Sequence, residues 1–161
     1  MRRLLKDYGA VALLVIAVLV LFGRRPGGPD LHDAAPEISV PDLQGGTVEL
    51  AELVGSPVVL NFWASWCGPC RQEIPEFTAF AKEHPEVQLI GVAVDSGSAA
   101  DVERAAKSFG ISYRVAVGDS SIMQRYKVSS LPTTVIIGPD GKVKASHVGM
   151  LNRKGLEAAL R

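Results

Sequence analysis

Apolar side chains form short unbroken stretches along much of the chain. In the segments between these stretches, apolar residues recur at spacings of three and four. The unbroken stretches are rich in β-branched residues and predict strands that are covered on both faces of a sheet. After the first of them, Ile74, Phe77 and Ala81 recur at spacings of three and four, which predicts a helix over residues 69–83. The predicted buried strands are residues 58–63, 88–94 and 133–137.

Shorter patterns fill the rest of the carboxy-terminal part. Ser98 suits the start of a helix that Gly110 ends, because Ser and Gly favour those two positions. Residues 139–141 (PDG) predict a tight turn between two strands. The remaining predicted elements are a turn at 41–46, strands at 47–50, 113–117 and 142–147, and helices at 121–126 and 153–160. This alternation predicts an α/β fold in which helices flank a central mixed sheet.

A different pattern opens the chain, where residues 8–23 carry no charged side chain. The run is apolar on every face and terminal, which argues against a buried core helix. A cleaved signal peptide fits the basic start and the apolar length, but the end of the run offers no small-x-small cleavage site. We therefore predict an uncleaved signal anchor, a transmembrane helix within residues 1–25, and keep the cleaved peptide as the alternative.

The charges that flank this run orient the predicted anchor. Three basic side chains precede the run and two follow it. Basic segments tend to stay in the cytoplasm, so we expect a single-pass protein of the cytoplasmic membrane whose carboxy-terminal part faces the periplasm or the cell exterior. Residues 26–33 are rich in Pro and Gly and predict a flexible tether. Residues 34–161 are then the folded domain.

The balance of charge narrows the classes of partner. The chain has 17 basic and 17 acidic side chains, and five basic and one acidic lie before residue 26. The remainder therefore carries 12 basic and 16 acidic side chains, without a cluster of Lys or Arg. Such a domain has no electrostatic footprint for nucleic acid, so we expect no nucleic-acid partner.

The two cysteines, Cys67 and Cys70, lie three residues apart directly after the first buried strand. A purely structural disulfide between them would close a very short loop and stabilise little. A zinc site needs a full set of ligands, but there is no second cysteine pair and the three histidines are scattered. The pair is therefore predicted to be a redox-active centre, with no metal and no cofactor beyond the Cys67–Cys70 disulfide itself.

The position of the pair favours thiol chemistry. Pro69 suits the first turn of a helix, where its missing N–H costs nothing, and this places Cys67 at the helix amino terminus. Free backbone N–H groups and the positive end of the helix dipole favour a thiolate there. The thiolate can attack a substrate disulfide to form a mixed disulfide. Cys70, one turn later on the same face, can then release the reduced substrate.

Residues 62–70 (FWASWCGPC) resemble the active-site segment of the thioredoxins, and residues 131–134 (LPTT) resemble their substrate-facing loop. Residues 71–75 (RQEIP) and 138–141 (GPDG) are similar to the membrane-tethered TlpA/ResA/CcmG-like branch of that family. The resemblance covers the chain from about Ala34 to its end. It implies a thioredoxin-like fold with an amino-terminal transmembrane anchor.

The resemblance also implies roles for individual residues. Cys67 is expected to be the exposed nucleophile and Cys70 the buried resolving thiol. Pro132 is expected to be cis, with a trans proline at the start of an edge strand as the alternative. Trp66 is expected to help dock the client protein, although plain packing fits it equally well. The residues expected to contact a substrate are Trp66, Gly68, Pro69, Leu131 and Pro132.

Two departures from thioredoxin bear on the mechanism. Asn61 stands where thioredoxins carry a buried aspartate, and it cannot accept a proton at neutral pH. Glu73, three residues after Cys70, matches the branch's active-site glutamate and is the candidate acid–base group. The alternative for Glu73 is an exposed helix glutamate. The stretch between Val94 and Gln124 is longer than in thioredoxin and implies an added helix–strand unit.

The implied function is that of a thiol–disulfide oxidoreductase, a protein-disulfide reductase. It would act on exported client proteins, such as apocytochrome c in cytochrome c maturation, and draw electrons from a thiol protein in the membrane. One alternative is a thiol peroxidase, because residues 35–36 (AP) are shared with peroxiredoxins, although the threonine of their peroxidatic motif is absent here. Another is a metal-delivery module, which generally uses CxxxC and a histidine.

Overall fold

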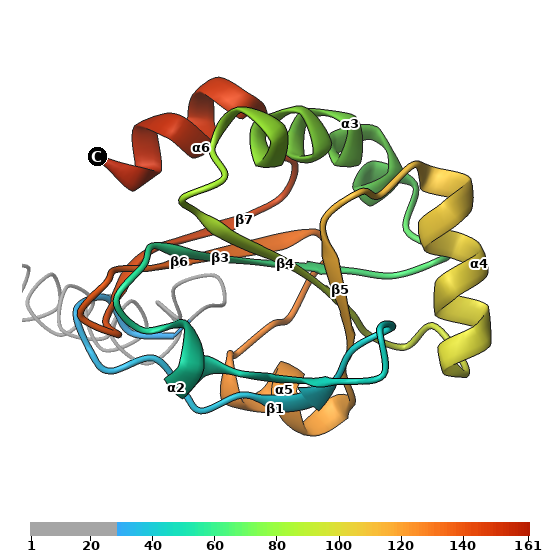
Figure 1. The fold of residues 1–161 in the computed structure, drawn as a ribbon, viewed down its shortest axis with the longest axis horizontal. Helices are drawn as coiled ribbons and strands as arrows, with labels where there is room; N and C mark the ends of the chain where they lie inside the picture. The colour runs from blue at the N-terminus through green and yellow to red at the C-terminus, as the bar shows by residue number, and fades with distance from the viewer. Residues whose placement is uncertain (1–28) are drawn as a thin grey trace, which may run out of the picture.

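The computed structural model describes residues 29–161 and has a five-stranded sheet at its centre (Figure 1). The strand order is β5-β4-β3-β6-β7. β3 (Val58–Trp63), β4 (Gln88–Ala93) and β5 (Arg114–Val117) are parallel. β6 (Thr133–Ile137) runs antiparallel to β3, and β7 (Val143–Val148) runs antiparallel to β6. The predicted mixed sheet is confirmed.

Helices cover both faces of this sheet (Figure 1). α3 (Gly68–Glu83), α4 (Ala99–Phe109) and α6 (Arg153–Leu160) lie on one face, and α5 (Ser120–Arg125) lies on the other. α4 and β5 occupy the stretch in which an extra helix and strand are expected. The predicted elements differ from the observed ones by at most two residues at their ends.

Alternate residues of β3 point into two different cores, because successive side chains of a strand face opposite sides of a sheet. Leu60 and Phe62 pack with Ile122 and Tyr126 of the α5 region. Val59 packs on the opposite face with residues of α3 and α6. All six β3 residues are buried. This double burial fixes the direction of β3 and hence the position of the cysteines that follow it.

Local chemistry explains where α4 begins and ends. The Ser98 side chain accepts a hydrogen bond from Asp101 N–H, and the Asp101 carboxylate accepts one from Ser98 N–H, which together form a capping box. Gly110 then adopts a left-handed conformation with φ of 72°, which a residue without a side chain adopts at little cost. Both predicted ends of this helix are confirmed.

The segment before β3 departs from the prediction. A two-stranded sheet joins β1 (Ser39–Pro41) to β2 (Thr47–Glu49), and α2 (Leu50–Leu53) follows at once. The pattern predicts neither β1 nor α2, because Pro41 begins a run rich in turn residues and Leu50 continues the alternation of residues 47–49. In the structure Pro41 lies in a strand instead of the predicted turn, and Leu50 begins a helix instead of ending a strand.

Residues 29–33 are also ordered differently from the flexible tether that their composition predicts. His32 N–H donates to Val143 O at 2.8 Å, and Val143 N–H donates to Asp33 O at 2.9 Å. Asp30 pairs with Lys127 at 2.7 Å. These bonds tie the segment to the edge strand β7, whose free backbone groups are available for pairing.

The predicted anchor lies outside the described residues, as do the first three residues of the predicted tether. Within residues 29–161, no helix is both long enough and apolar enough to span a bilayer.

Candidate active site

Cys67 and Cys70 form a disulfide at the point where β3 passes into α3. Cys67 is the residue that caps the helix, and its Sγ accepts a hydrogen bond from Cys70 N–H at 3.2 Å. Pro69 lies in the first turn, as predicted. Because the first N–H groups of a helix lack partners within it, a negative charge on Cys67 Sγ would be stabilised here.

The expectation of an exposed Cys67 is wrong for this disulfide form. Cys67 is 4% exposed and Cys70 is fully buried. Both pack in a cluster with Trp63 and Ala64, and Leu131 covers part of that cluster. Gly68 and Pro69, between the cysteines, are exposed.

Trp66 stands out from the surface beside the disulfide. Its side chain is 64% exposed, so it does not serve as core packing. Its indole Nε1–H donates to Asp95 O at 2.8 Å, which holds the ring in one orientation. A fixed and exposed indole offers a large apolar face to a docking protein.

The Leu131–Pro132 peptide bond is cis, as predicted. Pro132 is buried, and its carbonyl oxygen accepts a hydrogen bond from Gly149 N–H at 2.8 Å. Leu131 packs against the cluster that contains both cysteines. The loop before β6 and the disulfide are thereby brought together, although Leu131 follows Cys70 by 61 residues in the sequence.

A cavity of about 610 Å³ opens between Trp66 and Leu131. Its walls come from the loops that follow β4 and β5, from α5 and from the loop before Pro132. One wall is fixed to the active-site turn, because Ser96 Oγ accepts from Ser65 N–H at 2.9 Å and donates to Val94 O at 2.9 Å. The lining residues that bear charge, Asp95 and Asp119, are both acidic.

None of Asp95, Ser96 and Asp119 is predicted as a site residue from the sequence. A signal for them existed, because ligands of open α/β sheets bind beyond the carboxyl ends of the parallel strands. Asp95 and Ser96 follow β4 directly, and Asp119 follows β5.

Glu73, one turn after Cys70 on α3, is only 3% exposed, so the alternative of an exposed helix glutamate is wrong. Its Oε1 accepts from Asn61 Nδ2 at 2.7 Å, and its Oε2 accepts from Leu151 N–H at 3.0 Å. β3, α3 and the loop before α6 therefore meet at this one carboxyl group.

Burial raises the pKa of Glu73 from its ordinary value of 4.5 to about 7, against the opposing effect of the two hydrogen bonds it accepts. A carboxyl group in this range can both take up and release a proton near neutral pH. It lies one turn after Cys70 on the same helix. Such a pKa and position suit a group that exchanges protons with a thiol.

Asn61, the residue that departs from thioredoxin, is fully buried between Glu73 and Thr134. Its Oδ1 has no hydrogen-bond partner among the described residues, and the same holds for Trp63 Nε1 and the Tyr113 hydroxyl. Gly91, which pairs with Asn61 across the strands, leaves the space that the Trp63 and Tyr113 rings fill. This layer of the core is unusually polar.

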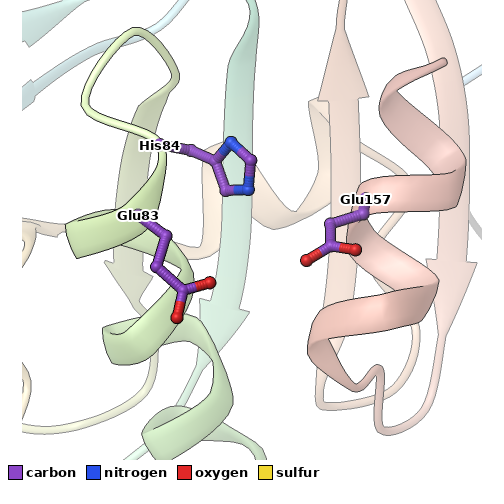
Figure 2. Close-up of side chains that lie close together, drawn as sticks. All are labelled: Glu83, His84 and Glu157. Carbon is purple, nitrogen blue, oxygen red and sulfur yellow. The ribbon is translucent and has the colours of Figure 1, made fainter.

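A second group of titratable side chains lies at the other end of α3. Figure 2 shows Glu83 and His84 of that end facing Glu157 of α6, and one ligand atom of each lies within 4.8 Å of the others. Glu83 already pairs with Arg153 at 2.6 Å, and His84 bonds to Glu86 at 3.1 Å. These partners occupy the groups, and we assign no metal site to them.

The chain has clear relatives. It matches the AhpC/TSA family over residues 31–146. It is 39% identical to the thiol-disulfide oxidoreductase ResA of Bacillus subtilis over 149 residues, which are 88% of this chain and 83% of ResA. It is 33% identical to the thioredoxin-like protein YneN of the same organism, over 86% of this chain and 84% of YneN.

A crystal structure from Chlorobium tepidum, of a protein assigned as the thiol:disulfide interchange protein DsbE, has the same fold. It is 32% identical with a TM-score of 0.75, over 81% of this chain and 94% of that one. The disulfide at the head of α3 and these similarities point to the same chemistry. The chain belongs to the AhpC/TSA family, and within it to the thioredoxin-like thiol–disulfide oxidoreductases.

Proposed function

We propose that the reduced form of this protein reduces disulfides in exported client proteins, with Cys67 as nucleophile, Cys70 as resolving thiol and Glu73 as acid–base group. The observation that carries the proposal is the buried Glu73 carboxyl group one turn after Cys70, on the helix that Cys67 caps. The Glu73 carboxyl group supplies a proton acceptor, and the capping position supplies a stabilised Cys67 thiolate.

The reaction balances in two steps. The Cys67 thiolate attacks one sulfur of the client disulfide, and a mixed disulfide forms as the first client thiolate leaves. Cys70 then passes its proton to the Glu73 carboxylate and attacks Cys67 Sγ, which breaks the mixed disulfide and expels the second client thiolate. The proton on Glu73 goes to the departing thiolate. The client gains two electrons, and the cysteine pair is oxidised to its disulfide.

The electrostatics beside the cysteines favour reduction over oxidation of clients. A strongly oxidising pair is one whose reduced form is stabilised by its surroundings. Here the buried carboxyl group opposes a second negative charge on Cys70. The amino terminus of α3 acts in the opposite direction, because it stabilises a Cys67 thiolate. We expect the effect of the buried carboxyl group to be the larger one, which gives a low reduction potential.

The docking surface in this proposal surrounds the disulfide. Exposed Trp66, Gly68 and Pro69 form one side, and Leu131 with cis-Pro132 forms the other. A client segment that lies along the loop before β6 can bond to its backbone as an added strand does. The cavity between Trp66 and Leu131 then receives side chains that flank the client cysteine.

The cellular setting is also a proposal. Residues 1–25 anchor the protein in the cytoplasmic membrane, the domain faces the periplasm or the cell exterior, and a thiol protein of the membrane re-reduces the disulfide. Apocytochrome c is the proposed client class, in cytochrome c maturation. The basic and apolar pattern of the first 25 residues and the resemblance to the tethered branch support this setting.

The first test is the reduction potential of the Cys67–Cys70 pair in the full chain, equilibrated against glutathione or dithiothreitol. We expect a value near that of thioredoxin, about −270 mV. A value near that of DsbA, about −120 mV, would make the protein an oxidant and overturn the proposed direction.

The same preparation tests the two alternatives from the sequence. Hydrogen peroxide added to the reduced protein should oxidise the pair no faster than it oxidises a free thiol, whereas a peroxidase would react many times faster. Copper(I) or zinc should not bind the reduced pair tightly, whereas a metal-delivery module would hold the ion in competition with a chelator.

A further inference from the structure

The carboxamide of Asn61 is bonded through its nitrogen alone. Its Nδ2 donates to Glu73 Oε1 at 2.7 Å and to Thr134 Oγ1 at 3.3 Å. Its Oδ1 is buried and has no partner among residues 29–161. Buried polar atoms without a partner are rare, so this one calls for a physical explanation.

Glu73 needs different neighbours in its two protonation states. As a carboxylate it accepts at both oxygens, from Asn61 Nδ2 and from Leu151 N–H. As an acid it carries one O–H group, which must donate. Leu151 N–H is a fixed donor, so the proton belongs on Oε1, the oxygen that faces Asn61. There it meets the Nδ2 protons, and two donors cannot bond to each other.

A half-turn of the Asn61 carboxamide about its own axis removes this conflict. Nitrogen and oxygen exchange places, and Oδ1 then accepts from the protonated Oε1 of Glu73. The Thr134 hydroxyl donates as well as accepts, so it bonds to the amide in either orientation. The position that Oδ1 now occupies has no donor among residues 29–161, so no bond at that position holds the amide in its present orientation.

We propose that Asn61 is a positioning residue whose carboxamide turns over as Glu73 gains or loses its proton, so that this carboxyl group stays hydrogen-bonded in both states. The inference rests on the proposed proton role of Glu73. When the Cys70 thiol gives its proton to Glu73, the amide presents Oδ1. When the proton passes to the departing client thiolate, the amide presents Nδ2 again. The amide itself gains no proton and no electron.

Tyr113 and His147 are titratable side chains on elements that adjoin this layer of the core. Tyr113, beside β5, is buried, and burial together with the negative charge of Glu73 raises its pKa above the ordinary value of 10. His147 of β7 pairs in register with Thr134, and its ring bonds to Met150 O at 3.2 Å. None of the ion pairs within the described part of the chain involves Glu73.

Charges on the neighbouring helices are held elsewhere. On α3 itself, Glu76 accepts from Arg153 N–H at 3.2 Å at the surface. The Arg153 guanidinium of α6 pairs with Glu83. Cys70 is the remaining titratable group next to Glu73, and it titrates in the reduced protein alone.

The direct test is an NMR titration of the full chain between pH 5 and 9, in the oxidised form so that neither cysteine titrates. The Glu73 carboxyl carbon and the Asn61 side-chain amide should change with one shared midpoint near pH 7. Nuclear Overhauser contacts from the Asn61 amide protons to the Thr134 side chain should be present at pH 9 and lost at pH 5. Contacts that stay unchanged across the titration would overturn the proposal, because the amide would then be a fixed donor.

Variants give a second, independent measurement. Asn61→Leu removes the amide at similar size, and we expect the Glu73 midpoint to rise by about one pH unit, because the ionised form loses the stronger bond. Thr134→Val should leave the midpoint close to the wild-type value, because the Thr134 hydroxyl bonds to the amide in both orientations. An unchanged midpoint in Asn61→Leu would contradict the proposal. If Asn61→Leu fails to fold, the wild-type titration still decides.

The failure of this inference and that of the proposed function are distinguishable. If Glu73→Gln leaves the pH profile of client reduction unchanged, Glu73 has no proton role and the assigned function of that residue falls. The titration of Asn61 still shows whether its amide turns. If the profile changes but the amide stays fixed, the function stands and the inference about Asn61 is wrong.

Discussion

The two ends of α3 carry the same carboxylate side chain in opposite surroundings. Glu73, two turns into the helix, is 3% exposed, and the sheet and the loop before α6 cover it. Glu83, in the last turn, is half exposed and pairs with Arg153. Burial raises the pKa of Glu73 to about 7, so its charge changes near neutral pH. Packing, more than residue type, therefore decides which end of the helix can handle protons.

The largest expected effect is on the reaction itself, at the amino-terminal end of α3. Cys67→Ser should abolish reduction of a client disulfide, because the thiolate that attacks is gone. The matched variant Cys70→Ser keeps the nucleophile and should accumulate a mixed disulfide, seen as a mass increase on a gel without reductant. Full activity of Cys67→Ser would show that the disulfide is not the reactive group.

Asn61→Asp would place a second carboxyl group about 2.7 Å from Glu73 Oε1. Two buried carboxylates at this distance cannot both ionise without a large cost. We expect the free energy of unfolding to fall by roughly 3–5 kcal/mol at pH 8 and by much less at pH 4, where both groups are protonated. Denaturant unfolding at the two pH values measures this, and equal losses at both would refute a charge effect.

Glu73→Gln should stabilise the protein above neutral pH. The pKa of Glu73 is raised in the folded state, so the stability that the carboxyl group contributes is complete below 4.5 and is lost as pH rises through about 7. The difference between the ordinary and the folded-state pKa of Glu73 lowers the free energy of unfolding by about 3 kcal/mol above pH 7. A neutral Gln avoids it, so the variant should gain up to about that amount at pH 8 and little at pH 4. A gain that does not depend on pH would point to packing instead.

The smallest effect is expected at the carboxy-terminal end of α3. Arg153→Ala removes the ion pair with Glu83, whose side chains are 39% and 51% exposed. Exposed ion pairs contribute little to stability, so the free energy of unfolding should fall by less than about 1 kcal/mol. Salt should reduce even this, because solvent screens exposed charges. A larger loss would show that the comparison between the two ends of α3 is too simple.

Features encoded within a few neighbouring residues could be predicted from the sequence. The cysteine pair, Pro69 in the first turn of α3 and the Ser98 cap each depend on residues within one or two turns. The cis bond at Pro132 follows from a local motif that resembles a known family. The positions of the buried strands along the chain follow from unbroken apolar runs.

Features that depend on distant contacts could not be predicted. The burial of Glu73 requires the N–H group of Leu151, 78 residues away, and the unpaired Asn61 oxygen depends on three elements that meet. Cys67 packs in a cluster that also contains residues of α4 and β5, which lie far away in sequence. A sequence pattern contains residue types in order, but it does not contain which loop covers which side chain.

The hydrogen bonds that residues 29–33 make with the domain could not be predicted for a related reason. Their Pro, Gly and Asp content is typical of a linker, but an open strand edge offers backbone partners to any sequence. The pairing of His32 and Asp33 with Val143 involves main-chain atoms, which composition does not describe.

The chain enters the domain where His32 bonds to Val143, beside the turn between β6 and β7. β3 begins next to the same turn and ends at Trp63, shortly before Cys67. At about 3.3 Å per residue, its length separates the entry point from the disulfide by about 20 Å. The first residues that the structure describes therefore join the domain at the end of β3 opposite the disulfide.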